Sequence, residues 1–234
     1  MRVLSVNTSL PRDLIWQGKP VHTSIFKQPV AGPVRVHADH LEGDGQADLK
    51  HHGGPDKAVY AYAAEHHAYW QTYVSSEKLG PGAFGENLTT EGLLESEVRL
   101  GDCFAVGTAV LMAMQPRIPC FKLNVRLDDA HMVKRFQAAG RSGIYFRVVE
   151  PGRVQAGDPL TLVQRSQYDV SIQQVVDNYY GLARDLPTIQ AILTVPFLRP
   201  SLRARFSSIL KKNRRKIAGV AAGGNALPRP YGVS

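Results

Sequence analysis

The sequence of 234 residues contains few cysteines, no long apolar run and, in its last third, few acidic residues. Its two cysteines, Cys103 and Cys120, are too few for a disulfide framework and form no Cys-x-x-Cys pair. We therefore expect two free thiols and a reducing, cytoplasmic setting. The longest apolar stretch, residues 109–114, is far shorter than the roughly 20 residues of a membrane-spanning helix. Residues 1–20 also lack the pattern of a signal peptide, so we expect neither a membrane anchor nor export.

Several common motifs for nucleotides and nucleophilic catalysis are absent from the sequence. It has no Gly-x-x-x-x-Gly-Lys-Ser/Thr loop for phosphates, and Gly43-x-Gly45 continues to Asp48 where a dinucleotide fingerprint requires glycine. No Gly-x-Ser-x-Gly element of a serine esterase occurs. Flavin, iron–sulfur and nicotinamide motifs are also absent, so any redox reaction would need electrons from another protein.

Pairs of adjacent histidines raise the question of a zinc site. His51 and His52 form one pair, and His66 and His67 form another. However, neither pair has the spacing of a zinc motif, and adjacent side chains on a helix point about 100° apart. Exposed or hydrogen-bonded histidines are therefore favoured over a metal cluster.

The basic residues are concentrated near the end of the chain. Residues 1–163 hold 17 basic and 17 acidic side chains, whereas residues 164–234 hold 11 and three, which accounts for the net charge of +8. Eight of the 18 residues in 199–216 are basic and none is acidic. A solvated helix face is favoured over a nucleic-acid site, because most charge runs are only solvated faces. This pattern predicts a charge-balanced domain followed by a basic segment.

The first part of the chain has the pattern of a mainly β domain. Short strand-like segments are separated by Gly-Asp and Pro turns, and no βαβ rhythm is present. Helices are predicted over residues 64–74 and between Asp128, as N-cap, and Gly140. We expect an α+β, mainly β, barrel-like domain. The predicted strands are residues 2–8, 34–37, 57–61, 109–115, 143–149 and 160–164.

The last part of the chain has a helical pattern. A capping box at Ser171 opens an amphipathic helix with apolar residues at helical spacing. Pro187 is suited to start a second helix, which Pro196 ends, and Pro200 to start a third. The predicted divisions are a β domain at residues 1–165, a basic three-helix segment at 166–216, and a mobile tail at 217–234.

The segment around Cys120 is the most informative for chemistry. It reads Gln-Pro-Arg-Ile-Pro-Cys-Phe-Lys-Leu over residues 115–123, and it follows an apolar strand. Arg117 and Lys122 flank the thiol in sequence, and nearby cations favour the reactive thiolate form of a cysteine. A thiolate is also a preferred ligand of soft metals. An inert core cysteine remains the alternative reading of the residues.

Two glycine-containing segments could bind an anion. Residues 41–48 and 52–60 contain Gly-rich turns whose backbone N–H groups can approach an anion closely, with His52 and Lys57 as further donors. Residues 84–88, Phe-Gly-Glu-Asn-Leu, have the composition of a tight turn, in which Asn87 can bind a ligand or cap the loop. The alternative is a set of ordinary turns with surface histidines.

Together these motifs resemble those of the MOSC domain family, the relatives of the molybdenum cofactor sulfurase C-terminal domain. The stronger similarity is to its YiiM-like branch, in which three helices follow the MOSC domain. The resemblance covers nearly the whole chain, and four motifs in the same order make it specific. They are Gly43-Asp44-x-Gln46-Ala47-Asp48, His52-Gly53-Gly54-x-Asp56-Lys57-Ala58-Val59-Tyr60, Phe84-Gly85-Glu86-Asn87-Leu88 and Gln115-Pro116-Arg117-x-Pro119-Cys120-x-Lys122-Leu123.

The resemblance implies a function for these residues. It implies a barrel-like domain that binds the molybdenum cofactor (molybdopterin), with Cys120 as a molybdenum ligand or sulfur carrier. It also implies reduction of small N-hydroxylated compounds such as 6-hydroxylaminopurine, which detoxifies them. His52 or Asp44 could supply a proton, without a choice between them. The predicted contacts to the cofactor phosphate are Arg117 and Lys122, followed by Lys27, His52, Lys57 and Asn87.

Other interpretations and partners stay open at this point. Cys120 could carry a persulfide received from a partner, because the chain lacks a recognisable desulfurase domain. The basic helices could bind nucleic acid or an acidic partner, although we do not expect nucleic acid. The reductase interpretation requires an electron-donor redox protein, and a homodimer is compatible with a β domain that carries a helical arm.

Overall fold

The computed structural model describes residues 1–47 and 53–223 and divides into two compact units, residues 1–184 and 185–234. Each unit is described by itself. The predicted join at residue 165 marks the change from strands to helices, whereas the division into units comes later. The reason is that helix α4 (Ile172–Tyr180) packs against strand β9 (Ala109–Pro116) of the first unit.

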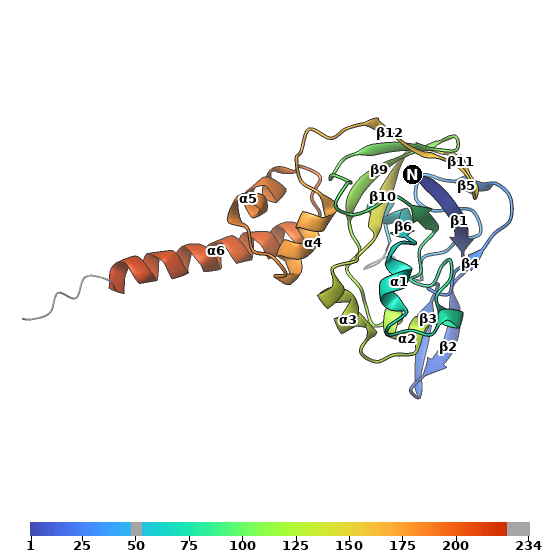
Figure 1. The fold of residues 1–234 in the computed structure, drawn as a ribbon, viewed down its shortest axis with the longest axis horizontal. Helices are drawn as coiled ribbons and strands as arrows, with labels where there is room; N and C mark the ends of the chain where they lie inside the picture. Colours follow the sequence, from blue (N-terminus) through green and yellow to red (C-terminus); the bar gives the residue numbers. More distant parts are fainter. Residues whose placement is uncertain (48–52, 224–234) are drawn as a thin grey trace, which may run out of the picture. The chain divides into compact units, whose positions relative to one another are not determined.

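A mixed sheet organises the described part of the first unit (Figure 1). Its order is β12-β8-β9-β10-β6-β7-β1-β4, and every neighbouring pair is antiparallel except β6–β7. Along β10 and the first part of β9, buried residues alternate with more exposed ones, which is the pattern of a sheet with one buried face. The other bounds are β1 (Arg2–Thr8), β4 (Gln28–Pro29), β6 (Val59–Ala63), β7 (Leu88–Glu91), β8 (Cys103–Val106), β10 (Ile144–Glu150) and β12 (Leu160–Gln164).

The sheet curls back on itself without forming a closed barrel. Val3 N–H donates to Asp158 O at 2.9 Å, and Leu160 N–H donates to Met1 O at 2.9 Å. These bonds bring β1 to the segment that leads into β12, at the opposite end of the strand order. The prediction of a mainly β, barrel-like domain with helices is confirmed.

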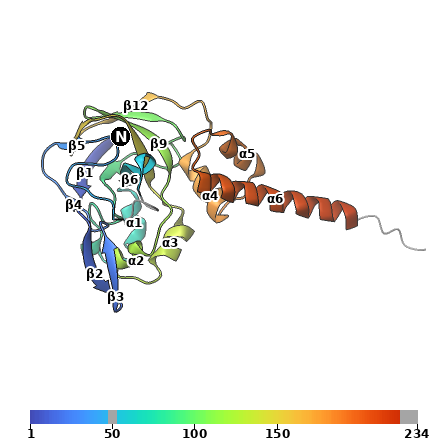
Figure 2. The ribbon, with the colours of Figure 1, turned by 180° about the vertical axis from the view of Figure 1, so that it is seen from behind.

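Two smaller pairs of strands accompany this sheet. β5 (Val34–Val36) pairs with β11 (Gly152–Val154), and β2 (Arg12–Trp16) pairs with β3 (Lys19–Thr23). The β2–β3 turn has positive φ at two successive residues, as a two-residue hairpin requires. The hairpin lies beside α2 (Lys122–Leu127) in both ribbon views (Figures 1 and 2).

The helices of the first unit are short, and two predictions need correction. α1 (His66–Trp70) is shorter than predicted, because the chain turns where Tyr73 N–H and Val74 N–H both bond to Trp70 O. Asp128 does not cap α3 (Met132–Ala139), because it ends α2 with a left-handed φ of 52°. The first turn of α3 is instead capped from α2, as Val133 N–H donates to Asn124 Oδ1 at 2.8 Å. The first unit also contains two single turns of 3-10 helix, η1 (Pro55–Lys57) and η2 (Ser76–Lys78).

An aromatic core lies between the sheet and these helices. Trp70 and Phe136 stack with ring centroids 5.7 Å apart, and Tyr62 stacks on Phe84 at 4.5 Å. Trp70 Nε1–H donates to the Tyr62 hydroxyl at 2.6 Å, which satisfies a buried polar group. All four side chains are at most 1% exposed. Tyr60 belongs to the same cluster, so the core also supports the residues described below as a candidate site.

The C-terminal helices follow their sequence signals. The capping box of α4 is present, with Gln174 N–H bonded to Ser171 Oγ at 3.1 Å and Ser171 N–H to Gln174 Oε1 at 2.8 Å. In the second unit, α5 (Leu186–Thr194) starts at its N-cap Asp185 and packs against α6. α6 (Pro200–Gly223) extends beyond residue 216, the predicted end of the helical segment.

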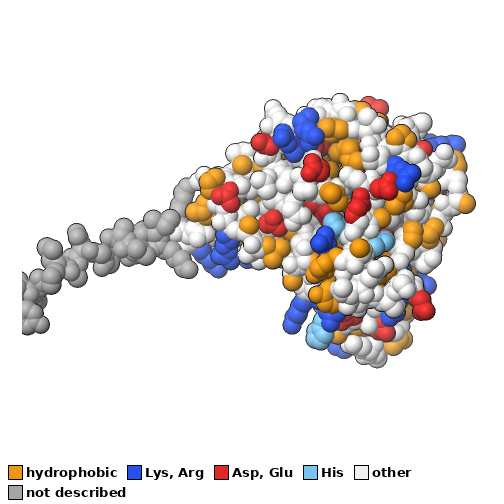
Figure 3. Space-filling model, in the orientation of Figure 1, with side chains coloured by type: hydrophobic (Ala, Val, Ile, Leu, Met, Phe, Trp, Pro, Cys, Tyr) orange, Lys and Arg blue, Asp and Glu red, His pale blue; other side chains and the backbone are white. Residues whose placement is uncertain are grey.

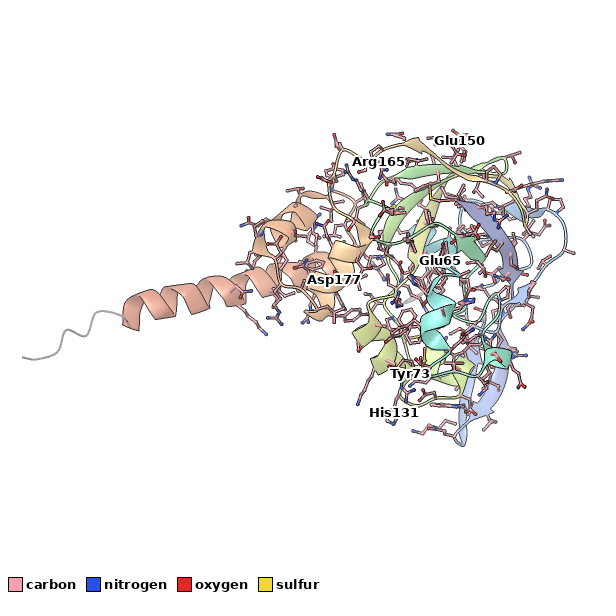
Figure 4. All side chains as sticks on the ribbon, viewed as in Figure 1. Glu65, Tyr73, His131, Glu150, Arg165 and Asp177 are labelled. Atoms are coloured by element: carbon pink, nitrogen blue, oxygen red, sulfur yellow. The ribbon has the colours of Figure 1, made fainter. Side chains whose placement is uncertain are left out.

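The surface mixes charges of both signs. On the face seen in Figure 3, basic and acidic side chains are interspersed over the first unit. Arg165, labelled in Figure 4, follows the last residue of β12. It donates to Asp102 at 2.8 Å, which fixes the chain where it leaves that strand. Within the helices that the structure describes, none combines the length and apolar character needed to cross a membrane.

Candidate functional site

A cavity in the first unit collects residues from six separated segments. Its empty volume is about 690 Å³, including the open solvent at its mouth. Among the described residues that line it, four are cationic and one is a carboxylate, so it is suited to an anionic ligand. The lining residues are Thr23, Ser24, Ile25, Lys27, Asp44, Gly45, Gln46, Ala47, Lys57, Ala58, Tyr60, Gly85, Asn87, Arg117, Ile118, Cys120, Lys122 and Tyr145.

Two tyrosines that pair across adjacent strands line the cavity. Tyr60 on β6 and Tyr145 on β10 are register partners, and their ring centroids are 5.0 Å apart. The Tyr60 hydroxyl donates to Ser142 O at 2.9 Å, and burial raises the pKa of Tyr60 well above its ordinary value. Lys57 Nζ lies 5.6 Å from the centre of the Tyr145 ring. The cavity therefore offers an aromatic surface next to cations.

Arg117 places a buried cation in the cavity. It follows the end of β9, and its guanidinium lies 5.1 Å from the Tyr60 ring centre and 5.5 Å from that of Phe136. The residue is only 6% exposed, and its Nη1 is buried without a hydrogen-bond partner in the described structure. A buried N–H without a partner is costly, and a guanidinium cannot lose its proton to escape that cost. Arg117 also lines the cavity, where its positive charge can pair with an anionic ligand.

Cys120 and Lys122 lie on the same loop as Arg117. The Cys120 thiol is free and half-buried, and it lines the cavity. Lys122 is the first residue of α2, and Leu123 N–H donates to Cys120 O at 3.0 Å, which fixes the backbone at the thiol. The loop thus brings one thiol and two cations to the cavity. The other cysteine, Cys103, is buried in β8, and burial raises its pKa.

Asp44 accepts hydrogen bonds at both of its carboxylate oxygens. Its Oδ1 pairs with Lys27 Nζ and accepts from Ser9 N–H at 2.9 Å. Its Oδ2 accepts from Asn87 Nδ2 at 2.8 Å. The Lys27 and Asp44 side chains are 8% and 5% exposed, so this is a buried ion pair. Burial lowers the pKa of Lys27, and the charge and hydrogen bond of Asp44, together with the charge of Glu86, oppose that shift.

A glycine turn behind the cavity holds Asn87. Tyr60 N–H donates to Asn87 Oδ1 at 3.0 Å, which joins the turn to β6. Glu86 is fully buried and accepts from the N–H groups of Gly82 at 2.7 Å and Phe84 at 2.9 Å. Burial raises the pKa of Glu86, although these donors oppose the shift. Gly85 has a φ of 75°, which favours glycine at this turn.

The structure brings together seven of the eight residues that were predicted for the site. The eighth, His52, lies outside the described residues. Sequence reasoning did not single out Tyr60 or Tyr145 as site residues, nor Thr23. The alternation of residues 144–150 could have shown that Tyr145 shares a face with other strand residues, but not which cavity it lines. The seven residues are Lys27, Asp44, Lys57, Asn87, Arg117, Cys120 and Lys122.

A second buried polar cluster, which we call the His66 cluster, comprises His66, Glu95, Arg141 and Gly143. His66 Nε2 bonds to Glu95 Oε2 at 2.8 Å, and Glu95 Oε1 accepts from Gly143 N–H at 2.6 Å. Arg141 Nη1 lies 3.2 Å from His66 Nδ1. Because arginine only donates, Nδ1 is the acceptor in this contact, while Nε2 faces the Glu95 carboxylate. In the part of the chain that is described, no three His, Cys, Asp or Glu side chains gather to hold a metal ion.

The curled sheet and its cationic, thiol-bearing cavity define a β domain with a candidate ligand site. Comparison with known proteins identifies the family of this domain. Residues 48–161 match the MOSC domain family. YflK of Bacillus subtilis is 43% identical over 212 residues, which cover 91% of this chain and 95% of YflK. The crystal structure of YiiM from Geobacillus stearothermophilus has a TM-score of 0.72 at 34% identity, covering 88% of this chain and 97% of that one. A protein named reductase from Gibberella moniliformis is 36% identical over 151 residues, which cover 63% of this chain and 27% of that protein.

The chain belongs to the MOSC domain family. Within that family it is a YiiM-like protein, since both its sequence and its fold match along most of the chain. The family is associated with binding of the molybdenum cofactor. The resemblance seen in the sequence is therefore confirmed.

Proposed function

We propose that the cavity binds the molybdenum cofactor and that the protein reduces small N-hydroxylated compounds such as 6-hydroxylaminopurine. The observation that carries the proposal is the excess of cationic side chains over carboxylates in a cavity that also contains the Cys120 thiol. Membership of the MOSC family and similarity to a protein named reductase support the same reaction class.

The residues of the cavity fit such a cofactor. Its terminal phosphate is an anion, and Arg117, Lys57 and Lys122 are cations along the cavity. A molybdenum centre prefers a soft ligand, and Cys120 provides the thiol. In the proposal, Cys120 holds the metal while the three cations hold the phosphate. Lys27 and Asn87, also predicted as phosphate contacts, are instead hydrogen-bonded to Asp44 in this structure.

The chain's own residues then have separate tasks. When bound, the cofactor supplies the two-electron chemistry. Tyr60 and Tyr145 provide a flat aromatic surface on which a planar base can lie. The lysines and Arg117 neutralise the ligand's charge in a partly enclosed space. Electrons come from a separate redox protein, which is a further part of the proposal, as is action in the cytoplasm.

Cofactor content tests the proposal directly. The protein is purified from a host that makes the cofactor, and molybdenum and pterin are measured per chain for wild type, Cys120→Ser and Arg117→Gln. We expect about one of each in wild type, loss of molybdenum in C120S, and loss of both in R117Q. Cys103→Ser is the control for a general effect of removing a thiol. Wild type without either component, or C120S with full reductase activity, would overturn the proposal.

A persulfide carrier is the second candidate, and the half-buried Cys120 thiol on the cavity surface favours it. Intact-protein mass spectrometry after incubation with a sulfur donor distinguishes the two. A carrier gains the mass of one sulfur atom on Cys120 and no molybdenum. A reductase binds molybdenum and reduces the hydroxylamine.

A further inference from the structure

Reduction of an N-hydroxylated amine requires protons as well as electrons. The overall reaction takes R–NHOH, two electrons and two protons to R–NH2 and water. The N–O bond breaks, one proton goes to nitrogen and the other to the departing oxygen. The electrons come from the reduced donor protein named in the proposed function, on which this inference rests. The open question is which side chain of the cavity delivers a proton.

Asp44 is poorly suited to be the donor. Both of its oxygens accept hydrogen bonds, from Lys27, Ser9 N–H and Asn87 Nδ2. Both oxygens are thus already engaged by donors, which leaves Asp44 placed as an acceptor and not as a donor to a ligand. Its environment makes it an acceptor that orients its neighbours.

Two other groups of the cavity are also unsuitable. Arg117 does not release a proton in proteins. The Tyr60 hydroxyl already donates to Ser142 O, and burial raises the pKa of Tyr60. His52 lies outside the described residues and carries no part of this inference.

Lys27 has the properties of a proton donor. It is 7% exposed and lines the cavity, and its ammonium group has three N–H donors, one of which bonds to Asp44. Burial lowers the pKa of Lys27, which makes its proton easier to transfer than that of an exposed lysine. Among the described groups, the charges that act on it are Asp44 and Glu86, and both oppose that shift.

We infer that Lys27 is the proton donor of the cavity and that Asp44 is a positioning residue that holds the ammonium group toward the ligand. Asp44 is in turn held by Asn87, whose backbone N–H and side-chain oxygen both bond to the backbone of Tyr60. The donor is thereby anchored to the same strand that supplies the aromatic surface. Lys27 thus takes a catalytic role in place of the phosphate contact predicted from sequence.

The first test measures the protonation of Lys27 without any cofactor. The side-chain nitrogen signals of ¹⁵N-lysine protein are titrated by NMR, with Lys27 assigned by its loss in Lys27→Gln. Lys19, an exposed residue on β3, is the internal reference. We expect Lys27 to lose its proton at a lower pH than Lys19 does. Asp44→Asn should lower the Lys27 midpoint further, since the Asp44 charge raises it.

The second test separates proton delivery from binding. Reduction of 6-hydroxylaminopurine is measured with a chemically reduced viologen dye, and molybdenum and pterin are measured in the same samples. Lys27→Arg keeps the positive charge but removes a transferable proton. We expect K27R to keep both cofactor components and a KM within about threefold, while kcat falls by about 100-fold or more. Asp44→Asn should shift the pH profile of kcat, and Lys19→Arg should change neither parameter.

The outcomes distinguish this inference from the proposed function. A cofactor-loaded K27R enzyme with kcat near that of wild type overturns the role of Lys27, as does a Lys27 midpoint at or above that of Lys19. Wild type without molybdenum overturns the proposed function and removes this inference with it. Loss of cofactor from K27R would return Lys27 to the predicted phosphate contact and also overturn its role as donor.

Discussion

The first unit contains two buried polar clusters of opposite character. In the His66 cluster, one carboxylate (Glu95) and one guanidinium (Arg141) are joined through His66. In the cavity, four cationic side chains face the single carboxylate of Asp44, and Arg117 Nη1 has no partner in the described structure. Buried charges are normally balanced and hydrogen-bonded. The His66 cluster balances its charges, although Arg141 Nε is also buried without a partner in the described structure. Among the described residues the cavity instead has four cations and one carboxylate, which suits it to an anionic ligand.

The two clusters share one short segment. Gly143 N–H bonds to Glu95 in the His66 cluster, while Ser142 O accepts from the Tyr60 hydroxyl at the cavity. Gly143 is next to β10, which presents Tyr145 to the cavity. This connection allows the balanced cluster to support the unbalanced one. The predictions below test whether the two differ as charge balance implies.

The largest expected effect is on stability, from the His66 cluster. Glu95→Ala leaves the buried His66 ring without its partner and removes the acceptor of Gly143 N–H. Breaking a buried pair in this way costs about 3–5 kcal/mol in the free energy of unfolding. Urea denaturation measures the loss, and Glu97→Ala, at an exposed neighbour, should stay within about 0.5 kcal/mol of wild type. A cost below 1 kcal/mol for E95A would contradict the structural role.

The reverse pattern is expected at the cavity. Arg117→Met removes a buried cation whose Nη1 has no partner, so the free energy of unfolding of the ligand-free protein should fall by less than about 1 kcal/mol, or should rise. Affinity for inorganic phosphate, measured calorimetrically, should drop by about 10- to 100-fold, since hydrogen bonds to charged groups contribute about 1.5–3 kcal/mol. If R117M loses stability but not affinity, Arg117 belongs with the structural cluster.

The shared segment should affect both clusters. A Cβ at Gly143 would lie 2.6 Å from Ala61 O, and the residue has a φ of 66°. Gly157 also has positive φ, yet a Cβ there would meet no atom within 4 Å. Gly143→Ala should therefore cost about 1–3 kcal/mol more than Gly157→Ala and should also weaken phosphate binding. Equal costs would show that this close approach is unimportant.

The smallest effect concerns pH and contrasts two buried glutamates. The pKa of Glu95 is lowered, because its hydrogen bonds from His66 and Gly143 outweigh the raising effect of burial. The pKa of Glu86 is raised, because burial dominates there. The contribution of Glu95 to stability is thus present above its unfolded pKa of about 4.3 and is lost as the pH falls through its folded pKa. The contribution of Glu86 is present below about 4.3 and is lost as the pH rises through its folded pKa.

Unfolding curves of E95Q, E86Q and wild type from pH 3 to 7 test these signs. The difference between wild type and E95Q should grow with pH, whereas the difference between wild type and E86Q should shrink. If both differences grew with pH, or both shrank, the surroundings of Glu95 and Glu86 would shift the two pKa values in the same direction. Each pKa unit corresponds to about 1.4 kcal/mol, which sets the size of the effect.

Sequence patterns located six of the strands to within two residues, because alternation and Gly turns are local signals, but β7 and β8 of the main sheet were not predicted. Residues 160–164 were predicted as the strand that is present, and the capping box at Ser171 was correct. Asp128 was misassigned because a left-handed C-cap and an N-cap favour the same polar residue types. Lys57, Arg117 and Lys122 came from motifs, but the pairing of Asp44 with Lys27 depends on a contact across 17 positions. No local pattern encodes such a contact.

The scattered origin of the cavity has a consequence for how the protein folds. Its lining comes from segments between residues 23 and 145, and β1 must also meet residues 158 and 160 before the sheet curls. Such distant contacts form slowly, because the entropy cost of closing a long loop arises before the contact contributes any stabilising energy. The ligand site therefore exists only once the whole domain has assembled. A ligand that binds only this state raises the melting temperature with its concentration. Heating the protein beside candidate anions is consequently a screen for its natural ligand.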